Sequence, residues 1–235
     1  MYQKNELDWA GSPFSVLPIN ALPELKKHKA LCVRPFLGTY FFRANVEKLP
    51  FTHPLMRKAF ALAVNRKEII ENVTQGEQTV ATGLVPAAMG LKNEPYFRDG
   101  DVALAKSYFK QALEELNLTE LPSISLMYVA GDRNHTIAQA VQQQWRATFG
   151  IEIKLEAIER KVYFDKLSKR DYQLATSSWT ADFKDPINFL EVFKYKAGGS
   201  NNTSWEHPRY AALLDLAMGA IDKEKRLNFL TGILR

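Results

Sequence analysis

The strongest constraint on the fold is a repeated change of hydrophobic pattern in the second half of the chain. Apolar residues run almost unbroken over 124–129, recur at helical spacing over 137–149, and alternate with polar residues over 151–157. A further helical stretch covers 162–167, and a strand-like stretch covers 172–178. The predicted order is strand, helix, strand, helix, strand. Because helices supply the crossovers that parallel strands require, this order predicts an α/β fold with helices on the faces of a sheet.

The first half of the chain is less regular. Its first 50 residues contain five prolines, which favours extended segments and turns over long helices. The aromatic and β-branched run at 39–42 predicts a strand, and its continuous apolarity predicts burial on both faces. Periodic apolar residues predict helices in several further stretches, which are Pro54 to about Asn65, 66–73, 102–116 with Asp101 as its cap, 208–220 and 223–234.

Composition places the chain among ordinary globular proteins. Its 235 residues suffice for one large domain or two small ones, and apolar residues make up 46% and charged residues 24%. The longest apolar run, residues 59–64, is far shorter than the ~18 residues that a membrane-spanning helix needs. Cys32 is the single cysteine, so an internal disulfide and a multi-cysteine metal site are excluded. Its apolar neighbours predict a buried, inert thiol.

The net charge of +5 raises the question of an anionic partner. The densest basic cluster is at 26–29, and nucleic acid is one partner that such a cluster can bind. Basic residues elsewhere are interleaved with acidic ones, and no nucleic-acid-binding motif accompanies them. We therefore predict a solvated basic face and no nucleic-acid partner. The first residues lack the apolar core of a secretory signal, so the sequence itself contains no direct evidence of export.

The sequence contains none of the common catalytic motifs. A zinc-protease motif, a phosphate-binding glycine loop, a nucleophile elbow and a catalytic-cysteine motif are all absent. The four histidines are widely spaced, and each is predicted to lie on the surface or to cap a helix instead of binding a metal. Asp165, Asp182 and Asp185 are the carboxylates that remain for acid–base chemistry. We predict that the protein is not an enzyme and has no cofactor, metal site or catalytic residue.

Residues 177–186, with the sequence S-S-W-T-A-D-F-K-D-P, have the most unusual local composition. They interrupt the regular pattern at the end of a predicted strand. In open α/β sheets the carboxyl ends of strands face ligand crevices, and this segment would bring an aromatic ring, hydroxyls and two carboxylates there. A purely structural interpretation competes with this one. Asp185 before Pro186 can start a turn or cap the next helix, and Trp179 can fill the core.

Several segments in a fixed order resemble those of oligopeptide-binding proteins of the peptide/nickel type. Residues 179–186 are similar to the family's W-x-x-D-Y-x-D-P motif, and residues 50–66 resemble its P-F-x-D-x-R-V-R-x-A-L-x-x-A-I-D-R signature. His53-Pro54 and Asn65 depart from the commoner residues of that signature. Residues 81–86 resemble the A-x-G-x-x-P segment, and residues 150–156 resemble the G-x-x-V-x-L-E strand. With Asp8-Trp9 and residues 200–202, the resemblance spreads over nearly the whole chain.

The resemblance implies a two-lobed solute-binding protein that closes on a peptide. The expected fold is a lobe of the periplasmic-binding-protein type II class, with a mixed sheet flanked by helices. Residues 1–45 would form a proline-rich lead-in with strands near the hinge, and residues 46–235 would form the C-terminal lobe. The N-terminal lobe and the final segment that returns to it are expected to be absent from this chain. By itself, such a lobe would carry half of a binding cleft.

The resemblance also assigns a peptide-binding role to residues 178–182. Members of the family commonly hold the α-ammonium group of the peptide with the aspartate of this motif, which is Asp182 here. A carboxylate accepts the ammonium's donors, and such charge-assisted bonds contribute about 1.5–3 kcal/mol each. Ser178, Trp179 and Thr180 are expected to pair through their main chain with the peptide as an added strand, next to Ala181. Trp179 is also the expected aromatic wall.

The other end of the peptide has no assigned partner. Leu167 and Thr176 stand where some relatives carry the arginines that would bind a peptide carboxylate. A longer peptide, recognition by the other lobe, or a different ligand therefore remain alternatives. Relatives in this family bind nickel complexes, haem, sugars or glutathione, whereas the retained Asp182 favours a free amine.

The expected partners are an oligopeptide and the membrane permease subunits of an ATP-driven (ABC-type) importer. The protein would be a monomer located in the periplasm or otherwise outside the cytoplasm, associated with the membrane through the transporter. Two other functions stay open. Some transcription regulators carry a similar solute-binding module as a sensor, and the carboxylates Asp165, Asp182 and Asp185 would be needed for a hydrolase.

Overall fold

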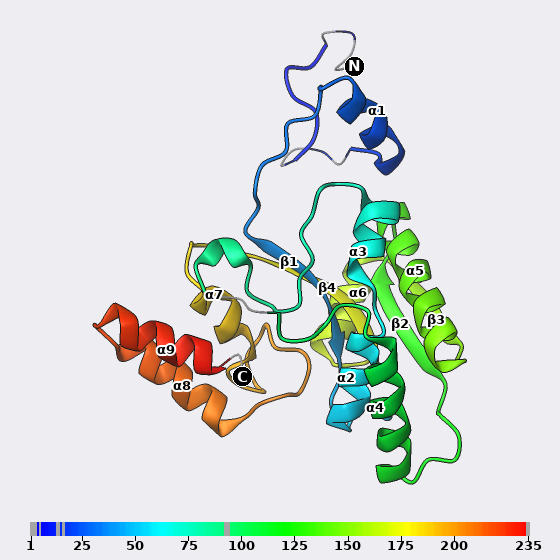
Figure 1. Cartoon of the computed structure of the whole chain (residues 1–235), viewed down its shortest axis with the longest axis vertical. Coiled ribbons are helices and arrows are strands. Elements are labelled where there is room, and N and C mark those ends of the chain that lie inside the picture. Colours follow the sequence, from blue (N-terminus) through cyan, green and yellow to red (C-terminus); the bar gives the residue numbers. More distant parts are fainter. Residues whose placement is uncertain (1–3, 5, 13–14, 16, 92–94, 234–235) are drawn as a thin grey trace.

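The structure is a computed structural model that describes residues 4, 6–12, 15, 17–91 and 95–233. Its centre is a four-stranded mixed sheet with the strand order β1-β4-β2-β3. The strands are β1 (Gly38–Ala44), β2 (Ile124–Val129), β3 (Ile153–Ile158) and β4 (Leu174–Thr180). β2 is parallel to both β3 and β4, whereas β1 is antiparallel to β4 (Figure 1). The predicted α/β class and the mixed sheet flanked by helices are confirmed.

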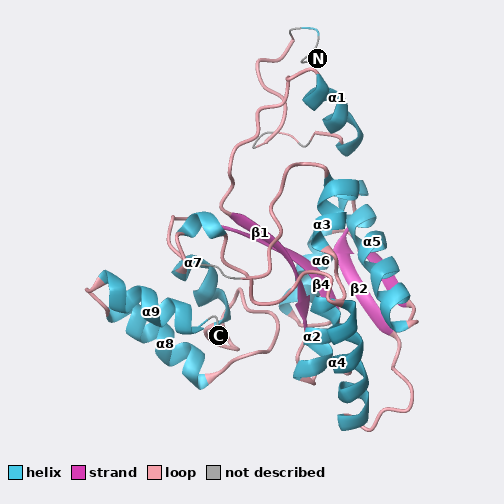
Figure 2. Cartoon of the chain, viewed as in Figure 1, coloured by secondary structure: helices cyan, strands magenta, loops and turns pink. Residues whose placement is uncertain are grey.

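Helices surround the sheet and form a separate group at one side of it (Figure 2). Within the described ranges, no helix is long and apolar enough to cross a membrane. The helices are α1 (Leu22–Lys27), α2 (Pro54–Leu62), α3 (Arg66–Ile69), α4 (Val102–Glu115), α5 (Asp132–Phe149), α6 (Arg160–Ser168), α7 (Ile187–Leu190), α8 (Pro208–Gly219) and α9 (Lys223–Ile233), with 3-10 turns at Ile19–Ala21, Ala87–Met89 and Glu191–Phe193 and a π-helical turn at Ile70–Thr74.

Local sequence signals set several helix ends. The Asp101 carboxylate accepts the Leu104 amide at 3.0 Å and caps α4 as predicted, because the first amides of a helix lack partners within it. His53 caps α2 in the same way, at 3.3 Å from the Leu55 amide, ahead of Pro54 in the first turn. Gly150 ends α5 with a φ of 72°, a left-handed conformation that glycine adopts without a Cβ penalty. These signals fix where the predicted helices begin and stop.

The two faces of the sheet bury different side chains. On one face, the buried residues Leu126, Tyr128 and Leu174 pack with α5, α2 and α4 in the main apolar core. On the other face, Met127 and Ala175 pack against Tyr163 and other residues of α6. The chain thus crosses from β2 to β3 over one face and from β3 to β4 over the opposite face. The boundary between β2 and β4 is therefore a topological switch point, the place where open α/β sheets form ligand crevices.

A third apolar cluster lies beside the sheet and brings the end of β4 together with the last helices. α8 and α9 pack against each other, and Leu214, Ala217 and Leu230 are buried between them and α7. Trp179 at the end of β4 and the adjacent Ala181 pack against this cluster. Figure 1 shows α8 and α9 beside each other, near α7 and away from α4 and α5.

Two sequence predictions of burial were wrong. β1 lies at the edge of the sheet, so Tyr40 is 40% exposed, and the strand is not buried on both faces. Cys32 is exposed, not buried, because its segment between α1 and β1 lies apart from the sheet and its cores (Figure 1). The end of the predicted last helix at Leu234 and the early Pro13 lie outside the described residues.

Candidate functional site

β4 has an open edge at the switch point. β1 pairs with all seven residues of β4, but β2 pairs only with Leu174 and Ala175. On its β2 side, the stretch 176–180 therefore has no neighbouring strand among the described residues. Exposed main-chain groups on such an edge are a ready template for an additional strand.

The register of β1 and β4 decides which main-chain groups lie on this edge. The Ala181 amide donates to Leu37 at 2.8 Å, and the Asn45 amide donates to Gln173 at 2.9 Å, so odd-numbered residues of β4 bond to β1. In an antiparallel pair, the residues between these point their N–H and C=O groups the other way. The main chains of Ser178 and Thr180 therefore face the open edge, while that of Trp179 faces β1.

The turn after β4 is organised by the side chain of Asn188, which is 2% exposed. Its Oδ1 accepts the Trp179 indole N–H at 3.1 Å and the Asp182 amide at 3.2 Å. Its Nδ2 donates to the Asp182 carboxylate at 3.4 Å. Leaving this buried amide without partners would cost free energy, so its hydrogen bonds are expected to persist. Asn188 of α7 therefore holds both the Trp179 ring and the Asp182 carboxylate in place.

Asp182 itself is exposed, and so are Ser178 and Thr180. Trp179 is partly buried, with its ring against the cluster of α7, α8 and α9. The carboxylate thus stands at the carboxyl end of β4, just past the open main-chain edge. This arrangement brings together all five predicted site residues, which are Ser178, Trp179, Thr180, Ala181 and Asp182.

Asp185 has the structural role that the competing interpretation gave it. Its Oδ1 accepts the Ile187 amide at 2.9 Å at the start of α7 and forms a salt bridge of 2.9 Å with Arg226 of α9. Partial burial opposes ionisation of this carboxyl, but the bonds from Arg226 and Ile187 outweigh it and hold its pKa below the ordinary value. Asp185 therefore ties the site segment to the last helix.

The two positions where relatives carry arginines are apolar or hydroxylic here and are closed to solvent. Leu167 is 5% exposed and Thr176 is 4% exposed. The Tyr163 hydroxyl donates to the Thr176 carbonyl and occupies that acceptor. Burial raises the pKa of Tyr163, so its hydroxyl stays protonated and remains a donor. Neither position supplies a positive charge for a peptide carboxylate.

The carboxylates considered for hydrolysis have separate partners. Asp165 bonds to Lys169 at 2.8 Å on the exposed side of α6, whereas Asp185 bonds to Arg226 and Asp182 to Asn188. No hydrogen bond joins any two of these three described carboxylates. In the part of the chain that the structure describes, no group of three or more His, Cys, Asp or Glu side chains is arranged to hold a metal ion.

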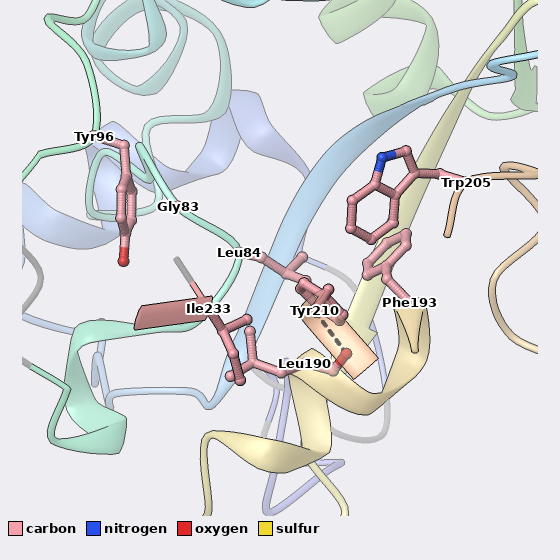
Figure 3. Close-up of a pocket in the computed structure, with 8 residues that line it drawn as sticks. All are labelled: Gly83, Leu84, Tyr96, Leu190, Phe193, Trp205, Tyr210 and Ile233. Atoms are coloured by element: carbon pink, nitrogen blue, oxygen red, sulfur yellow. Dashed lines mark hydrogen bonds between the residues drawn. The ribbon is translucent and has the colours of Figure 1, made fainter. Parts of the chain in front are cut away.

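A pocket of about 350 Å³ lies between the helical group and the loop that precedes α4, and Figure 3 shows it. None of residues 178–182 lines it. The Tyr210 hydroxyl in its wall donates to the Leu190 carbonyl at 2.7 Å, drawn as a dashed line. Its lining consists of Gly83, Leu84, Tyr96, Leu190, Phe193, Trp205, Tyr210 and Ile233. The pocket is mostly aromatic and aliphatic and is separate from the open edge of β4.

Comparison with known proteins identifies the family of the chain. The sequence profile of bacterial extracellular solute-binding proteins, family 5, matches residues 1–201. The chain belongs to this family. It is 43% identical over 235 residues to the oligopeptide-binding protein OppA of Bacillus subtilis, and this match covers 97% of the chain and 43% of the relative. The chain therefore spans less than half the length of that curated relative.

Solved structures of the family support the fold. A periplasmic oligopeptide-binding protein from Borrelia burgdorferi superposes with a TM-score of 0.87 at 24% identity, covering all of the chain and 46% of that protein. Haemophilus influenzae OppA in complex with the peptide RPPGFSPFR superposes with a TM-score of 0.85 at 25% identity, covering 99% of the chain and 46% of that protein. The predicted type II periplasmic-binding-protein fold is confirmed.

Asn188 was assigned no role from the sequence. Its position two residues after Pro186 and nine after Trp179 has no periodic signature, and only the fold turns its side chain back toward the end of β4. The open edge of β4 was missed as well, because strand pairing is a property of two distant segments. The one available sequence signal for a role of Asn188 was a polar residue among the apolar residues 187–190.

Proposed function

We propose that this chain forms part of the peptide-binding component of an ABC-type oligopeptide importer. The single observation that carries the proposal is the open edge of β4, which lies at the switch point of the sheet and leads directly to Asp182. A peptide added to this edge would gain main-chain hydrogen bonds irrespective of its sequence. Haemophilus influenzae OppA, with the same lobe fold, has a structure in complex with a peptide.

The peptide would pair with the main chain of Ser178 and Thr180, since the main chain of Trp179 is directed to β1. Its α-ammonium group would bind the Asp182 carboxylate, which Asn188 orients. Trp179 and Ala181 would line the site through their side chains. With the amino end at Asp182, the peptide would run antiparallel to β4, from Thr180 toward Thr176.

The protein would work outside the cytoplasmic membrane and pass its ligand to permease subunits in the membrane. Relatives described as periplasmic oligopeptide-binding proteins support this location. The protein would act as a monomer, with residues 46–235 as one lobe of a two-lobed molecule and residues 1–45 leading from the hinge. No nucleic acid, cofactor, metal or catalytic step is part of the proposal.

Titration calorimetry of the full-length natural protein that contains this chain tests the role of Asp182. A free-amine alanine pentapeptide is compared with its N-acetylated twin. Because charge-assisted bonds contribute ~1.5–3 kcal/mol, the free-amine peptide should bind at least about tenfold more tightly, and Asp182→Ala should remove the difference. Asp165→Ala, which changes an exposed carboxylate on α6, is the matched control and should leave the preference intact.

The result that contradicts the proposal is an equal loss of affinity for both peptides in Asp182→Ala, or equal binding of both peptides by the wild type. Because Asp182 is exposed, the variant should keep the thermal stability of the wild type within about 0.5 kcal/mol, which separates a binding defect from unfolding.

A further inference from the structure

The open edge of β4 ends at Thr176. The carbonyl of this residue accepts a hydrogen bond from the Tyr163 hydroxyl, and β2 begins to pair with β4 at the preceding residue. A peptide with its amino end at Asp182 would therefore pair with the main chains of Thr180 and Ser178 and no further along β4. Its carboxyl end would lie where β2 and β4 separate.

The register sets how long such a peptide would be. Its first residue would bond to the main chain of Thr180, its second would lie opposite Trp179, and its third would bond to Ser178. A fourth residue would lie opposite Ser177, beside the occupied carbonyl of Thr176. Main-chain pairing stops there, so the carboxylate of a peptide of about four residues would reach the start of α5.

Arg133 brings a positive charge to this place. It is the second residue of α5, which begins shortly after the end of β2, and it is exposed. The side-chain amide of Asn134 donates to the Val129 carbonyl at 2.9 Å, and Tyr128 and His135 share a hydrogen bond of 2.5 Å. These contacts fix the first turn of α5 on the end of β2. Among the described residues, no carboxylate forms an ion pair with Arg133.

The charge of Arg133 acts across β4 on Tyr40 of β1. Desolvation of the Tyr40 hydroxyl raises its pKa to about 12, whereas a hydrogen bond with Thr176 and the positive charge of Arg133 act in the opposite direction. Tyr40 shares a face of the sheet with Phe42, whose ring lies 6.0 Å from that of Trp145 in α5. Because α5 connects β2 to β3, and β4 lies between β2 and β1, Arg133 and Tyr40 extend from opposite sides of the open edge.

Tyr40 supplies a neutral donor at the same end of the edge. The residue is 40% exposed, but its hydroxyl is shielded and stays protonated at neutral pH because its pKa is raised. A guanidinium has donors only, and a protonated hydroxyl adds one more. Such a pair suits a carboxylate, which accepts hydrogen bonds and carries the opposite charge.

We propose that Arg133 and the Tyr40 hydroxyl bind the terminal carboxylate of a peptide of about four residues. This inference rests on the proposed function and specifies the length and the free carboxyl end of its ligand. Arg133 would take the role of the arginines that some relatives carry at the positions of Leu167 and Thr176, which are closed to solvent here. The competing interpretation is that Arg133 is a solvated residue of α5, in which case the charge at the carboxyl end of the peptide would be irrelevant.

Calorimetry with the full-length natural protein that contains this chain tests the carboxylate contact. The ligands are peptides of alternating alanine and serine with four or eight residues, each with a free carboxylate and as its C-terminal amide. Because hydrogen bonds between charged groups are the stronger ones, the four-residue acid should bind at least about tenfold more tightly than its amide. The eight-residue peptide would extend past Arg133, so its acid and amide should bind equally.

Arg133→Met assigns the preference to this residue. The variant should bind the four-residue acid and amide equally, and its affinity for the amide should stay within about threefold of the wild type. Because Arg133 is exposed, the variant should unfold at the same urea concentration as the wild type. Tyr40→Phe should remove part of the preference. Arg209→Met is the matched control, since it removes an exposed arginine of α8, and it should keep the full preference.

Equal binding of the four-residue acid and amide by the wild type would overturn the role of Arg133 and leave that of Asp182 untouched, because acetylation tests the other end of the peptide. A preference for the acid that survives in Arg133→Met, or that is lost equally in Arg209→Met, would overturn it too. If the acid is preferred but acetylation makes no difference, Asp182 is excluded and Arg133 is retained.

The eight-residue peptide tests the proposed length. An equally large preference for its acid would overturn the length, and so would failure of the four-residue peptides to bind a protein that binds the alanine pentapeptide. Failure of every peptide to bind would overturn both this inference and the proposed function.

Discussion

The body of the sheet and the turn after β4 are held together by different kinds of interaction. In the body, aromatic and aliphatic side chains from α2, α4 and α5 fill one face of the sheet, with Trp145 at 2% exposure near the centre. In the turn, one buried amide, that of Asn188, forms hydrogen bonds with both an exposed carboxylate and a half-buried ring. The difference teaches that the fold is secured by packing, whereas the site is secured by a few polar contacts.

The largest effect is expected on the free energy of unfolding when Trp145, in the body of the sheet, is replaced. Its ring lies 5.1 Å from that of Phe60, and its indole N–H donates to the Phe60 carbonyl at 2.9 Å. Trp145→Ala would leave a cavity and an unpaired carbonyl, so we expect a loss of ~3–5 kcal/mol in the free energy of unfolding. Urea unfolding measures it. Trp9→Ala is the matched control at a residue 60% exposed, and a similar loss there would contradict the account.

A smaller effect is expected at Asn188, where stability and binding should fall together. Asn188→Ala removes the acceptor of the Trp179 indole and the Asp182 amide, and we expect a loss of ~1–3 kcal/mol in stability. The freed turn should also bind free-amine pentapeptides several-fold more weakly. Unfolding and calorimetry on the same preparation measure both quantities.

The exposed Asn72 gives the matched control, because Asn72→Ala changes the same side chain far from the site. If Asn188→Ala binds the peptide as tightly as the wild type, the buried amide does not position Asp182. The proposed dependence of peptide binding on the turn would then be wrong.

The smallest effect is expected at the salt bridge of Asp185 and Arg226, and it should depend on pH. Because the folded-state pKa of Asp185 is lowered, its contribution is present above the ordinary value of 3.8 and is lost as the pH falls through the folded-state pKa. Asp185→Asn should therefore cost under ~1 kcal/mol at pH 7 and progressively less in acid. Chemical unfolding from pH 7 to pH 3 measures the difference.

Arg226→Met should produce a similar pH-dependent loss, since it removes the other partner of the same bridge. A cost of Asp185→Asn that stays constant over this pH range would mean that the capping bond to Ile187 stabilises the turn without help from the charge.

The sequence was sufficient for the parts of the molecule that depend on periodic burial. The order of strands and helices from residue 124 to 180 follows from apolar spacing, and the cap at Asp101 follows from residue type. Burial of both faces of the strand at 39–42 and burial of Cys32 were predicted wrongly, because neighbouring residues do not reveal whether a strand lies at a sheet edge or a segment lies apart from the core.

The candidate site was only partly predictable. Residues 178–182 were found through their composition and their resemblance to a family motif. The open edge of β4 depends on strand pairing between distant segments, and the role of Asn188 depends on a turn that folds α7 back onto the end of β4. No local pattern encodes such contacts, so they required the folded structure.

Amide hydrogen exchange at the end of β4 tests the central claim most directly, because it reports on each main-chain N–H separately. In the full-length protein saturated with a free-amine pentapeptide, the amides of Ser178 and Thr180 should exchange at least about tenfold more slowly than in the free protein. The Trp179 amide, already directed to β1, should change little. Unchanged exchange at Ser178 and Thr180 under saturation would show that the peptide does not pair with the open edge of β4.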